Sequence, residues 1–390
     1  MSHYQILKVF TFLNQKNEYD LSKSQVFRRF VISTTDKIMK PNKMTAAFRI
    51  SILTIICLYF CNNIYAQNKT FTNPLLPSGA DPYSIYKDGY YYYTNTTQNK
   101  LVIWKTKNLA DLATAENKTV WTPPADTRYS KELWAPELHF IEGKWYMYFA
   151  ADDGKNDNHR MYVIENSSSD PLAGEWTFKG EVKTPENKWA IDGDIFENNG
   201  QYYMIWSGWE GDKNGQQNIY IAKMDNPWTI SGTRTKISGS DFDWEKHGDL
   251  NDKNNPPHVN VNEGPQFLKN KDKVFIIYSA SGCWTDFYAL GMLQTSATAD
   301  FMNAASWTKS PQPVFKQSPE NKVFAPGHNS FFKSPDGTED WILYHANEES
   351  GQGCGRFRSP RAQKFTWNAD GTPNFGTPVK TTDKQAVPSE

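Results

Sequence analysis

Five ionisable residues stand at comparable places along the chain, each a short distance before a stretch of aromatic and β-branched residues. They are Asp81, Glu137, Asp192, Glu263 and His328. A single carboxylate at such a place commonly caps or begins a turn. Carboxylates that converge on one axis repel each other, however, so their joint occurrence favours a functional site. Several carboxylates in one cavity suit glycosidic bond hydrolysis, where one donates a proton to the leaving oxygen and another activates water.

The stretches that follow these residues define an internal repeat. Each has a turn and then a run rich in Tyr, Trp, Ile and Val, which is typical of the second strand of a β-hairpin. The five runs are 88–93, 142–148, 199–206, 272–278 and 339–344. Further strands are expected at 101–104, 161–164, 218–222 and 288–292, and outer strands at 176–178 and 307–309.

Five such units predict an all-β fold, a five-bladed β-propeller that occupies residues 67–390 as one catalytic domain. A stacked β-solenoid and a large sandwich are the alternatives. If the aromatic run is the second strand of each blade, the strand before it lines the central channel and carries the five ionisable residues. The polar segment 247–262 is expected to be a surface loop.

Composition agrees with this fold class and excludes others. Aromatic residues make up 15% of the chain, which argues against an all-α bundle. The 42 basic and 43 acidic residues nearly cancel. The chain therefore lacks the positive charge of a nucleic-acid-binding protein.

The first 66 residues have the character of a targeting segment. The apolar run 52–61 follows three basic residues and predicts a signal peptide at 39–66, with cleavage near Ala66 and a secreted or periplasmic product. The run is shorter than the roughly 20 residues of a membrane-spanning helix, so no membrane span is expected. Residues 1–38 are interpreted as a misannotated extension before a start at Met39 or Met44. Lipoprotein processing at Cys61 is the rival interpretation, which the bulky Phe60 disfavours.

Two cysteines, Cys283 and Cys354, remain after the predicted cleavage. In an oxidising compartment they could form one disulfide, and two separate buried thiols are the alternative. No C-x-x-C or paired-His spacing suggests zinc, and no organic cofactor is expected.

Four motifs resemble the signature of glycoside hydrolase family 43, five-bladed propeller enzymes acting on arabinose-, xylose- and galactose-containing polysaccharides. The motifs are Ala80-Asp81-Pro82, the segment around Asp192, Asn262-Glu263-Gly264-Pro265 and Gly327-His328-Asn329. The resemblance covers about residues 72–378. It implies inversion at the sugar, with Asp81 as general base, Glu263 as general acid and Asp192 as the carboxylate that modulates the pKa of the acid.

The resemblance also implies two further contacts. His328 would lie beside a calcium or sodium ion in the channel that is held largely through water, and hard cations prefer oxygen ligands. Arg361 would contact the sugar or the modulator carboxylate. The sequence departs from the usual pattern of the family at the modulator position, where Ile191-Asp192-Gly193-Asp194 offers two aspartates on one strand face. Asp192 is favoured for its Ile-Asp context, and Asp194 remains the second candidate.

Other residues are weaker candidates for substrate binding. Trp134, Trp209 and Trp284 could stack on a sugar, although blade cores also use tryptophan. Glu137 could bind substrate hydroxyls or support neighbouring blades. Three histidines are interpreted as structural or rim residues, namely His139, His159 and His345.

Within the family that the motifs resemble, we predict a secreted, exo-acting α-L-arabinofuranosidase. Exo action is expected because Trp209 and the bulky segment 281–287 could close the channel into a pocket. A β-D-xylosidase, a galactofuranosidase and an arabinanase are alternatives within the family, since loops set specificity. A carbohydrate-binding propeller without activity would share the fold but would not need the carboxylates. A six-bladed sialidase is disfavoured because its Ser-x-Asp-x-Gly-x-Thr-Trp turns are absent. The partner is a polysaccharide or oligosaccharide, and a monomer is expected.

Overall fold

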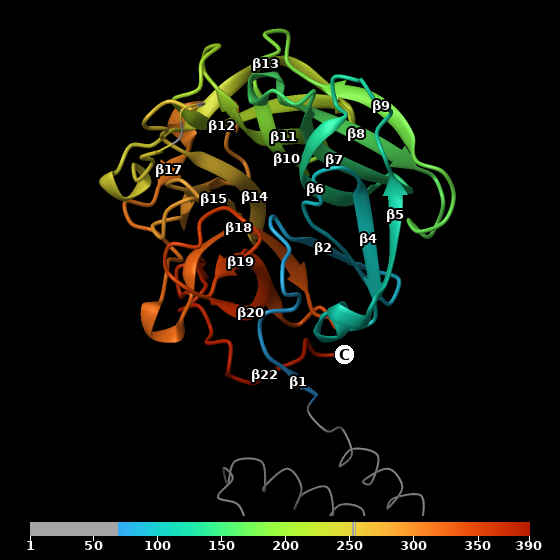
Figure 1. Ribbon diagram of the computed structural model, residues 1–390, viewed down its shortest axis with the longest axis vertical. Helices are drawn as coiled ribbons and strands as arrows, with labels where there is room; N and C mark the ends of the chain where they lie inside the picture. Colours follow the sequence, from blue (N-terminus) through green and yellow to red (C-terminus); the bar gives the residue numbers. More distant parts are fainter. Residues whose placement is uncertain (1–68, 252, 254) are drawn as a thin grey trace, which may run out of the picture. The chain divides into compact units, whose positions relative to one another are not determined.

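A computed structural model describes residues 69–390, with the exception of 252 and 254. The predicted signal peptide at 39–66 and the extension at 1–38 lie outside the described residues. The described part contains five antiparallel four-stranded sheets arranged in a ring (Figure 1). The predicted all-β, five-bladed propeller is therefore confirmed. Among the described residues, no helix is long and apolar enough to cross a membrane.

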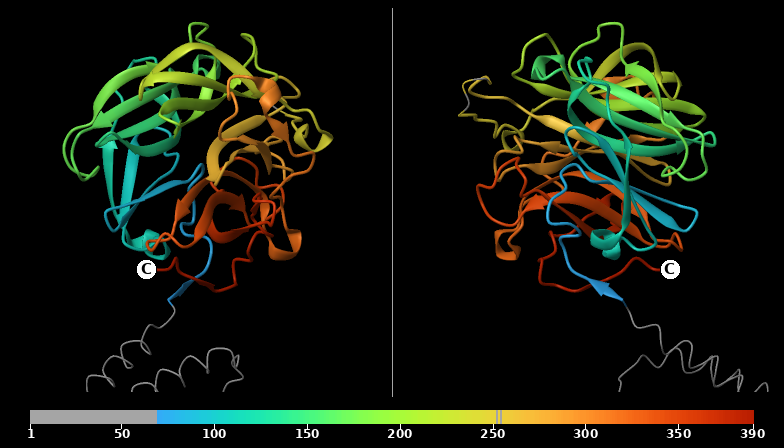
Figure 2. Two further views of the ribbon diagram at one scale, coloured as in Figure 1. Left: turned by 180° about the vertical axis from the view of Figure 1, so that it is seen from behind. Right: turned by 45° about the vertical axis from the view of Figure 1, so that its right-hand side comes forward.

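Each blade is a meander of four strands that follow one another in the chain. The first strands of neighbouring blades contact one another around the ring, so they are the innermost (Figure 2). The blades consist of β2 (Tyr83–Lys87), β3 (Tyr90–Thr94), β4 (Leu101–Thr106) and β5 (Glu116–Trp121); β6 (Lys131–Ile141), β7 (Lys144–Asp152), β8 (Arg160–Asn166) and β9 (Thr177–Val182); β10 (Ala190–Asn198), β11 (Gln201–Trp209), β12 (Gln217–Asn226) and β13 (Thr229–Ser238); β14 (Asn262–Asn270), β15 (Lys273–Ala280), β16 (Ala289–Ser296) and β17 (Thr308–Lys309); and β18 (Phe324–Lys333), β19 (Asp340–Asn347), β20 (Ser359–Trp367) and β21 (Pro373–Asn374).

The five aromatic runs are the second strands, as predicted, and the expected third and outer strands are present. Short 3-10 helices occur in the connections, at η1 (Leu109–Thr114), η2 (Asn156–Asn158), η3 (Asp243–Glu245), η4 (Ala304–Ser306) and η5 (Pro319–Asn321). The aromatic strands pack between blades, as where Tyr148 of β7 and Trp206 of β11 share one buried cluster. A single blade cannot bury both of its faces, so the blades stabilise one another.

The ring closes through the segment before the first blade. β1 (Thr70–Phe71) pairs with β22 (Gln385–Ala386) in a separate two-stranded sheet. The side chain of Asn73 then bridges to the last blade, since its amide donates to the carbonyl of Ala362 (3.0 Å) and its oxygen accepts the Ala362 N–H (2.9 Å). A buried cluster that includes Phe71, Leu343 and Ala362 fills the junction.

The inner strands share a backbone irregularity that positions the ionisable residues. A positive φ angle of 44° to 58° recurs at the corresponding place in each blade, at Asp81, Ala135, Asp192, Gly264 and His328. In four of the inner strands the pairing register shifts beside this residue, as in a β-bulge. Backbone strain of this kind is characteristic of functional sites.

The bulges divide the channel residues into two layers. Asp81, Asp192 and His328 occupy the positive-φ position itself, and Glu263 stands one residue before it. Two residues further along each strand comes a second layer, made up of Tyr83, Glu137, Asp194, Gln266 and Ser330. Glu137 was expected to be equivalent to the other four ionisable residues, but it belongs to this second layer. Sequence spacing could not reveal this difference, because the extra residue of a bulge shifts the alternation of faces.

Candidate active site

One pocket of about 440 Å³ brings together residues from separate blades at one end of the channel. Asp81, Asp192, Glu263 and His328, four of the five predicted ionisable residues, lie in its wall. Of the predicted sugar-stacking residues, Trp134 and Trp284 also line it. The volume is within the range of small-molecule sites, so the pocket can hold a small ligand.

Asp81 is surrounded by cationic and polar partners. Its Oδ1 lies 3.2 Å from His328 Nδ1, 3.2 Å from Arg358 Nη1 and 3.5 Å from His345 Nδ1. Thr96 donates its hydroxyl to Oδ2 (2.6 Å). Burial alone would raise the pKa of Asp81, but His328, Arg358, His345 and Thr96 together lower it below its usual range. Asp81 is therefore a carboxylate at neutral pH.

Arg358 is the permanent positive charge among these partners. The backbone N–H of Asp81 donates to His345 Nδ1 (3.0 Å), so this nitrogen carries no proton. Burial and the charge of Arg358 lower the pKa of His345, and burial lowers that of His328 against the attraction of Asp81. A guanidinium, in contrast, stays charged throughout the range in which imidazoles titrate, so the attraction between Arg358 and Asp81 does not depend on the protonation of the imidazoles.

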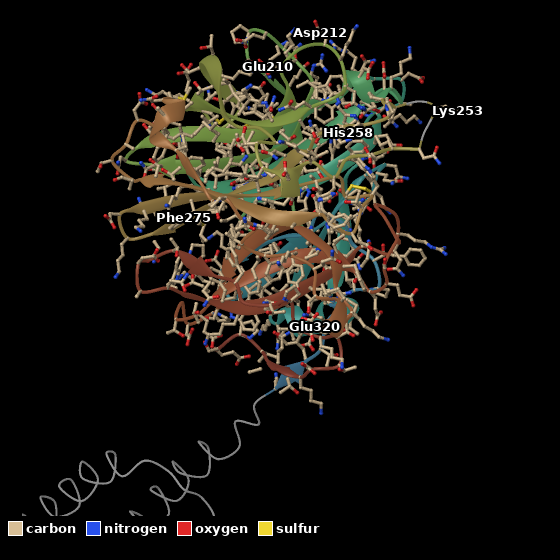
Figure 3. All side chains as sticks on the ribbon, turned by 90° about the vertical axis from the view of Figure 1, so that its left-hand side faces the viewer. Glu210, Asp212, Lys253, His258, Phe275 and Glu320 are labelled. Carbon is tan, nitrogen blue, oxygen red and sulfur yellow. A yellow bond between two sulfur atoms is a disulfide. The ribbon has the colours of Figure 1, made fainter. Side chains whose placement is uncertain are left out.

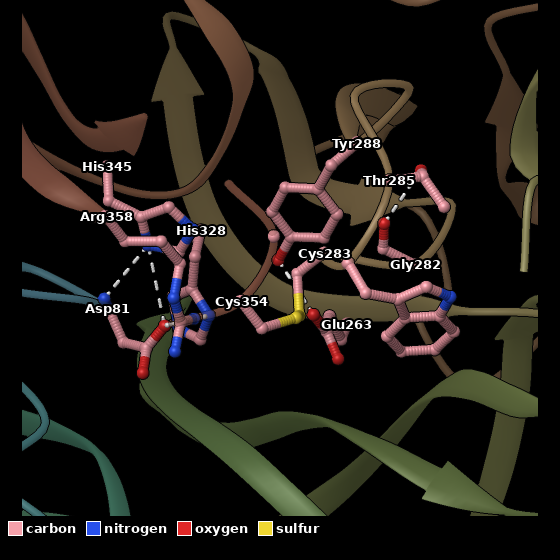
Figure 4. The surroundings of a disulfide bond; sticks show 12 residues. Asp81, Glu263, Gly282, Cys283, Thr285, Tyr288, His328, His345, Cys354 and Arg358 are labelled. Carbon is pink, nitrogen blue, oxygen red and sulfur yellow. Dashed lines mark hydrogen bonds and ion pairs between the residues drawn. A yellow bond between two sulfur atoms is a disulfide. The ribbon is translucent and has the colours of Figure 1, made fainter. Parts of the chain in front are cut away.

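Glu263 has a contrasting environment. Tyr288 donates its hydroxyl to Glu263 Oε1 at 2.8 Å (Figure 4). Burial raises the pKa of Glu263 to about 7, helped by the charge of Asp81 and opposed by the Tyr288 hydrogen bond and by Arg358. Glu263 therefore keeps a proton up to neutral pH and is able to donate it.

Asp192 is tied to the strand that carries Glu263. Its Oδ2 accepts the N–H of Gly264 at 3.0 Å. Burial raises the pKa of Asp192 well above its usual value, and the neighbouring Glu263 and Asp81 carboxylates raise it further. Like charges held this close disfavour ionisation of both members of the pair, so Asp192 and Glu263 influence each other's protonation.

Asp194, the second candidate for modulator, lies in the deeper layer and not in the pocket wall. Its Oδ2 accepts the N–H of Phe267 at 2.8 Å. Asp192 and Asp194 thus hold β14 at two points, on either side of the bulge that follows Glu263. The pocket position and the contact next to Glu263 favour Asp192 for the modulator role.

Glu137 also lies away from the pocket wall, in a buried polar cluster with His139, Asp194 and Gln266. Gln266 donates to Glu137 Oε1 (2.6 Å), and His139 Nε2 lies 3.3 Å from Glu137 Oε2 and 3.7 Å from Asp194 Oδ1. Burial and the charges of neighbouring carboxylates raise the pKa of Glu137 well above its usual value, and burial raises that of Asp194 to about 7. These contacts tie Glu137 to residues of neighbouring blades, and Glu137 does not line the pocket.

The two places where a channel cation could bind differ in their ligands. His328 offers one nitrogen, and its Nδ1 already faces Asp81, a carboxylate that also contacts Arg358. In the deeper layer, Glu137, His139 and Asp194 each offer a ligand atom, all within 4.8 Å of one another. Hard cations prefer oxygen, so the carboxylates of this deeper cluster fit such an ion better than the surroundings of His328 do.

Two further residues predicted to bind substrate lie outside the pocket wall. Trp209 is buried and stacks on Trp189 at 4.8 Å, and it is Trp189 that lines the pocket. Arg361 is completely buried on β20, opposite Tyr344 of β19 and within the blade. Alternation along the strand directs Arg361 into the blade packing, while the loop residue Arg358, just before the strand, reaches Asp81.

Sequence reasoning missed several residues that contact the carboxylates of the pocket or line its wall. Tyr288 and Arg358 stand immediately before β16 and β20, the third strands of adjacent blades, and each contacts a carboxylate of the pocket. His345, interpreted as a structural or rim residue, contacts Asp81. The polar segment 247–262 also contributes, through Leu250, Asn255 and Val259. Figure 3 shows Lys253 and His258 of this segment on the same side of the molecule as the disulfide.

The disulfide itself forms part of the pocket wall. Cys283 and Cys354 are bonded, with their Cα atoms 5.2 Å apart, so the alternative of two separate thiols is excluded. The bond joins the loop that ends in Tyr288 to the loop that ends in Arg358 (Figure 4). One crosslink therefore fixes the two loops whose side chains hold Glu263 and Asp81.

Comparison with known proteins gives a consistent result. The family model for glycosyl hydrolases family 43 matches residues 71–373. An extracellular exo-α-(1→5)-L-arabinofuranosidase from Streptomyces avermitilis is 45% identical over 80% of this chain and 64% of its own length. A second protein of that description, from Streptomyces chartreusis, is 36% identical over 71% of this chain and 83% of its own. The match thus spans less than two thirds of the Streptomyces avermitilis relative.

A solved structure agrees with these relatives. The crystal structure of an α-L-arabinofuranosidase from Lactobacillus brevis superposes with a TM-score of 0.73 at 38% identity, covering 80% of this chain and 98% of that one. Structures of a xylan β-1,4-xylosidase and an endo-arabinase, at 17% and 18% identity, share the fold.

Proposed function

Because this chain belongs to glycoside hydrolase family 43, we propose that it is an exo-acting α-L-arabinofuranosidase that removes terminal arabinofuranose from plant polysaccharides. The observation that carries the proposal is a pocket in which a protonated Glu263 and an ionised Asp81 face one small cavity. The relatives from both Streptomyces species and the Lactobacillus structure support arabinofuranose as the sugar.

The proposed reaction assigns each carboxyl group one role. Asp81 accepts a proton from water as the water attacks the anomeric carbon, and Glu263 donates its proton to the departing oxygen. Asp192 holds the adjacent Gly264 through its Oδ2 and, when ionised, would disfavour ionisation of the neighbouring Glu263. Direct attack by water on the face opposite the leaving group gives net inversion.

The first test is a panel of aryl glycosides. We expect 4-nitrophenyl α-L-arabinofuranoside to be hydrolysed much faster than the corresponding β-D-xyloside or β-D-galactofuranoside. Proton NMR of the first-formed sugar should show the inverted anomer. A preference for the xyloside would refute the sugar assignment, binding of arabinan without hydrolysis would favour a carbohydrate-binding propeller, and a retained anomer would refute the roles given to Asp81 and Glu263.

Secretion is proposed together with the activity. The Cys283–Cys354 disulfide is of a kind that forms in oxidising compartments, and both Streptomyces relatives are described as extracellular. We expect cells to export the protein as a monomer cleaved near Ala66. N-terminal sequencing and light scattering of the exported protein test both points.

A channel cation is proposed as a supporting element. Glu137, His139 and Asp194 would hold calcium or sodium, with water as the remaining ligands, and the ion would offset the repulsion between buried carboxylates. If so, calcium should raise the thermal midpoint of the protein, and Asp194→Asn should abolish that increase. An unchanged midpoint over a wide calcium range would contradict the proposal.

A further inference from the structure

Two phenylalanines stand out on the surface. Among the residues that the structure describes, Phe287 and Phe357 are the large apolar side chains left exposed, at 52% and 46%. Each lies two residues before the third strand of its blade, Phe287 before β16 and Phe357 before β20. Adjacent blades thus repeat the same feature, and exposed apolar groups that occur together commonly mark a binding surface.

Both phenylalanines belong to the loops that form the pocket wall. Phe287 immediately precedes Tyr288, which donates to Glu263, and Phe357 immediately precedes Arg358, which contacts Asp81. Consecutive Cα atoms are about 3.8 Å apart, so each ring starts next to a residue that reaches a catalytic carboxylate. Figure 4 shows Tyr288 and Arg358 on either side of the disulfide.

The two loops are tied to each other and are not independent flaps. Besides the disulfide, Asp286 accepts hydrogen bonds from the N–H of Gly351 (2.9 Å) and from the hydroxyl of Ser350.

The ring of Phe287 stacks on His247 with 3.9 Å between centroids, which covers one face of the phenyl ring. Its exposure therefore comes from the other face and the edge. Such a prearranged surface loses little conformational entropy on binding.

We propose that Phe287 and Phe357 form a stacking platform for the sugar units that follow the terminal unit of the substrate chain. The proposal rests on the exo activity proposed above, because only then does one terminal sugar fill the pocket while the rest of the chain stays outside. That chain leaves past the loops that carry Cys283, Trp284 and Cys354, which form this side of the wall. The C–H faces of furanose rings are apolar and pack on aromatic rings.

The experiment compares two substrates that differ only in length, α-1,5-linked arabinobiose and arabinotetraose. The variants are Phe287→Ala, Phe357→Ala and the pair of them, with Phe287→Tyr and Phe357→Tyr as matched controls that keep the ring. We expect the double alanine variant to lose about tenfold in kcat/KM on the tetraose, mainly through KM, and clearly less on the biose. The tyrosine variants should keep the length preference of the original chain.

Several outcomes would overturn the platform. One is an unchanged ratio of tetraose to biose kcat/KM in the double alanine variant. Another is an equal loss on both lengths, which would indicate a disturbed pocket. A third is a lower mass by light scattering after the alanine substitutions, which would show that the rings pack against a second copy of the chain. If the original chain hydrolyses neither substrate, both the proposed function and the platform are refuted. If the original chain is active and the double alanine variant keeps its tetraose-to-biose ratio, only the platform is refuted.

Discussion

Asp81 is buried and Glu263 is half-buried, yet their surroundings give them opposite protonation states at neutral pH. The charge of Arg358 helps to lower the pKa of Asp81, whereas burial and the charge of Asp81 raise the pKa of Glu263 against the opposing hydrogen bond from Tyr288. A carboxylate base and a carboxylic acid can therefore operate side by side. The division of roles depends on these surroundings and not on the carboxylates alone.

The proposed acid role of Glu263 predicts a dependence on the leaving group. Glu263→Gln should lower kcat on natural arabinosides by about 10²–10⁴-fold, because their alkoxide leaving group needs the proton. The loss on an activated aryl arabinofuranoside, whose phenolate leaves without help, should be far smaller. Steady-state kinetics on the two substrate types check this prediction, and equal losses on both would argue against Glu263 as the acid.

The pKa of Glu263 also predicts a pH dependence. The acid must be protonated, so activity should fall as the pH rises through about 7. The Tyr288 hydrogen bond stabilises the ionised form, so Tyr288→Phe should raise the pKa of Glu263 and move this alkaline limb to higher pH. The pH profile of kcat/KM measures the shift.

Tyr344→Phe serves as a matched control, because the Tyr344 hydroxyl bonds Gln363 inside a blade. Its alkaline limb should stay in place. If the alkaline limb of the Tyr288→Phe variant also stays in place, or moves to lower pH, that limb cannot be assigned to Glu263.

At the scale of elements, the bulged inner strands and the loops before the third strands act together. In β18, Gly327 lies against the ring of Tyr288, and a Cβ at this glycine would come within 2.2 Å of the ring. The close approach of Tyr288, which donates a hydrogen bond to Glu263, thus explains the glycine in the Gly327-His328-Asn329 motif. The strand of one blade supports the loop of the neighbouring blade.

Gly327→Ala should therefore displace Tyr288, lower kcat/KM and move the alkaline limb in the direction expected for Tyr288→Phe. Gly211→Ala is the control, because nothing lies near a Cβ added there. Kinetics and near-ultraviolet circular dichroism of both variants test this prediction. Full activity in Gly327→Ala would show that Tyr288 does not need its present position.

Residue patterns predict the blades and the carboxylates but not the loops. The aromatic runs identify the second strands because every blade must bury the same face, and Asp81, Asp192 and Glu263 stand at fixed places before them. Glu137 was assigned to the wrong layer because bulges shift the alternation of faces. Arg361 was predicted to contact the sugar or the modulator carboxylate, and Arg358 was not singled out, because only the folded loop, crosslinked through Cys354, shows that Arg358 reaches Asp81.

For the whole molecule, the ring is closed by side-chain packing and a few bridging hydrogen bonds. No four-stranded sheet in the described part of the chain combines strands from both ends, and the small β1–β22 sheet is separate. The backbone N–H of Gly79 donates to the carbonyl of Arg358 (2.9 Å), so the closing segment also supports an arginine of the pocket. Closure of the ring and shape of the site are therefore linked.

Asn73→Ala tests this closure. It removes both hydrogen bonds to Ala362 and leaves the Ala362 N–H without its buried partner, which should lower the free energy of unfolding by about 1–3 kcal/mol. Urea unfolding measures the change, with Asn374→Ala at an exposed position of the outer strand β21 as the control. A loss no larger than that of the control would show that the ring does not depend on this bridge.

If the pocket accepts one terminal arabinofuranose at a time, a time course of the products from linear α-1,5-arabinan should show it. We expect arabinose to be the only sugar released from the earliest time points, while the polymer shortens gradually. Early release of arabino-oligosaccharides, with a rapid fall in polymer length, would contradict it.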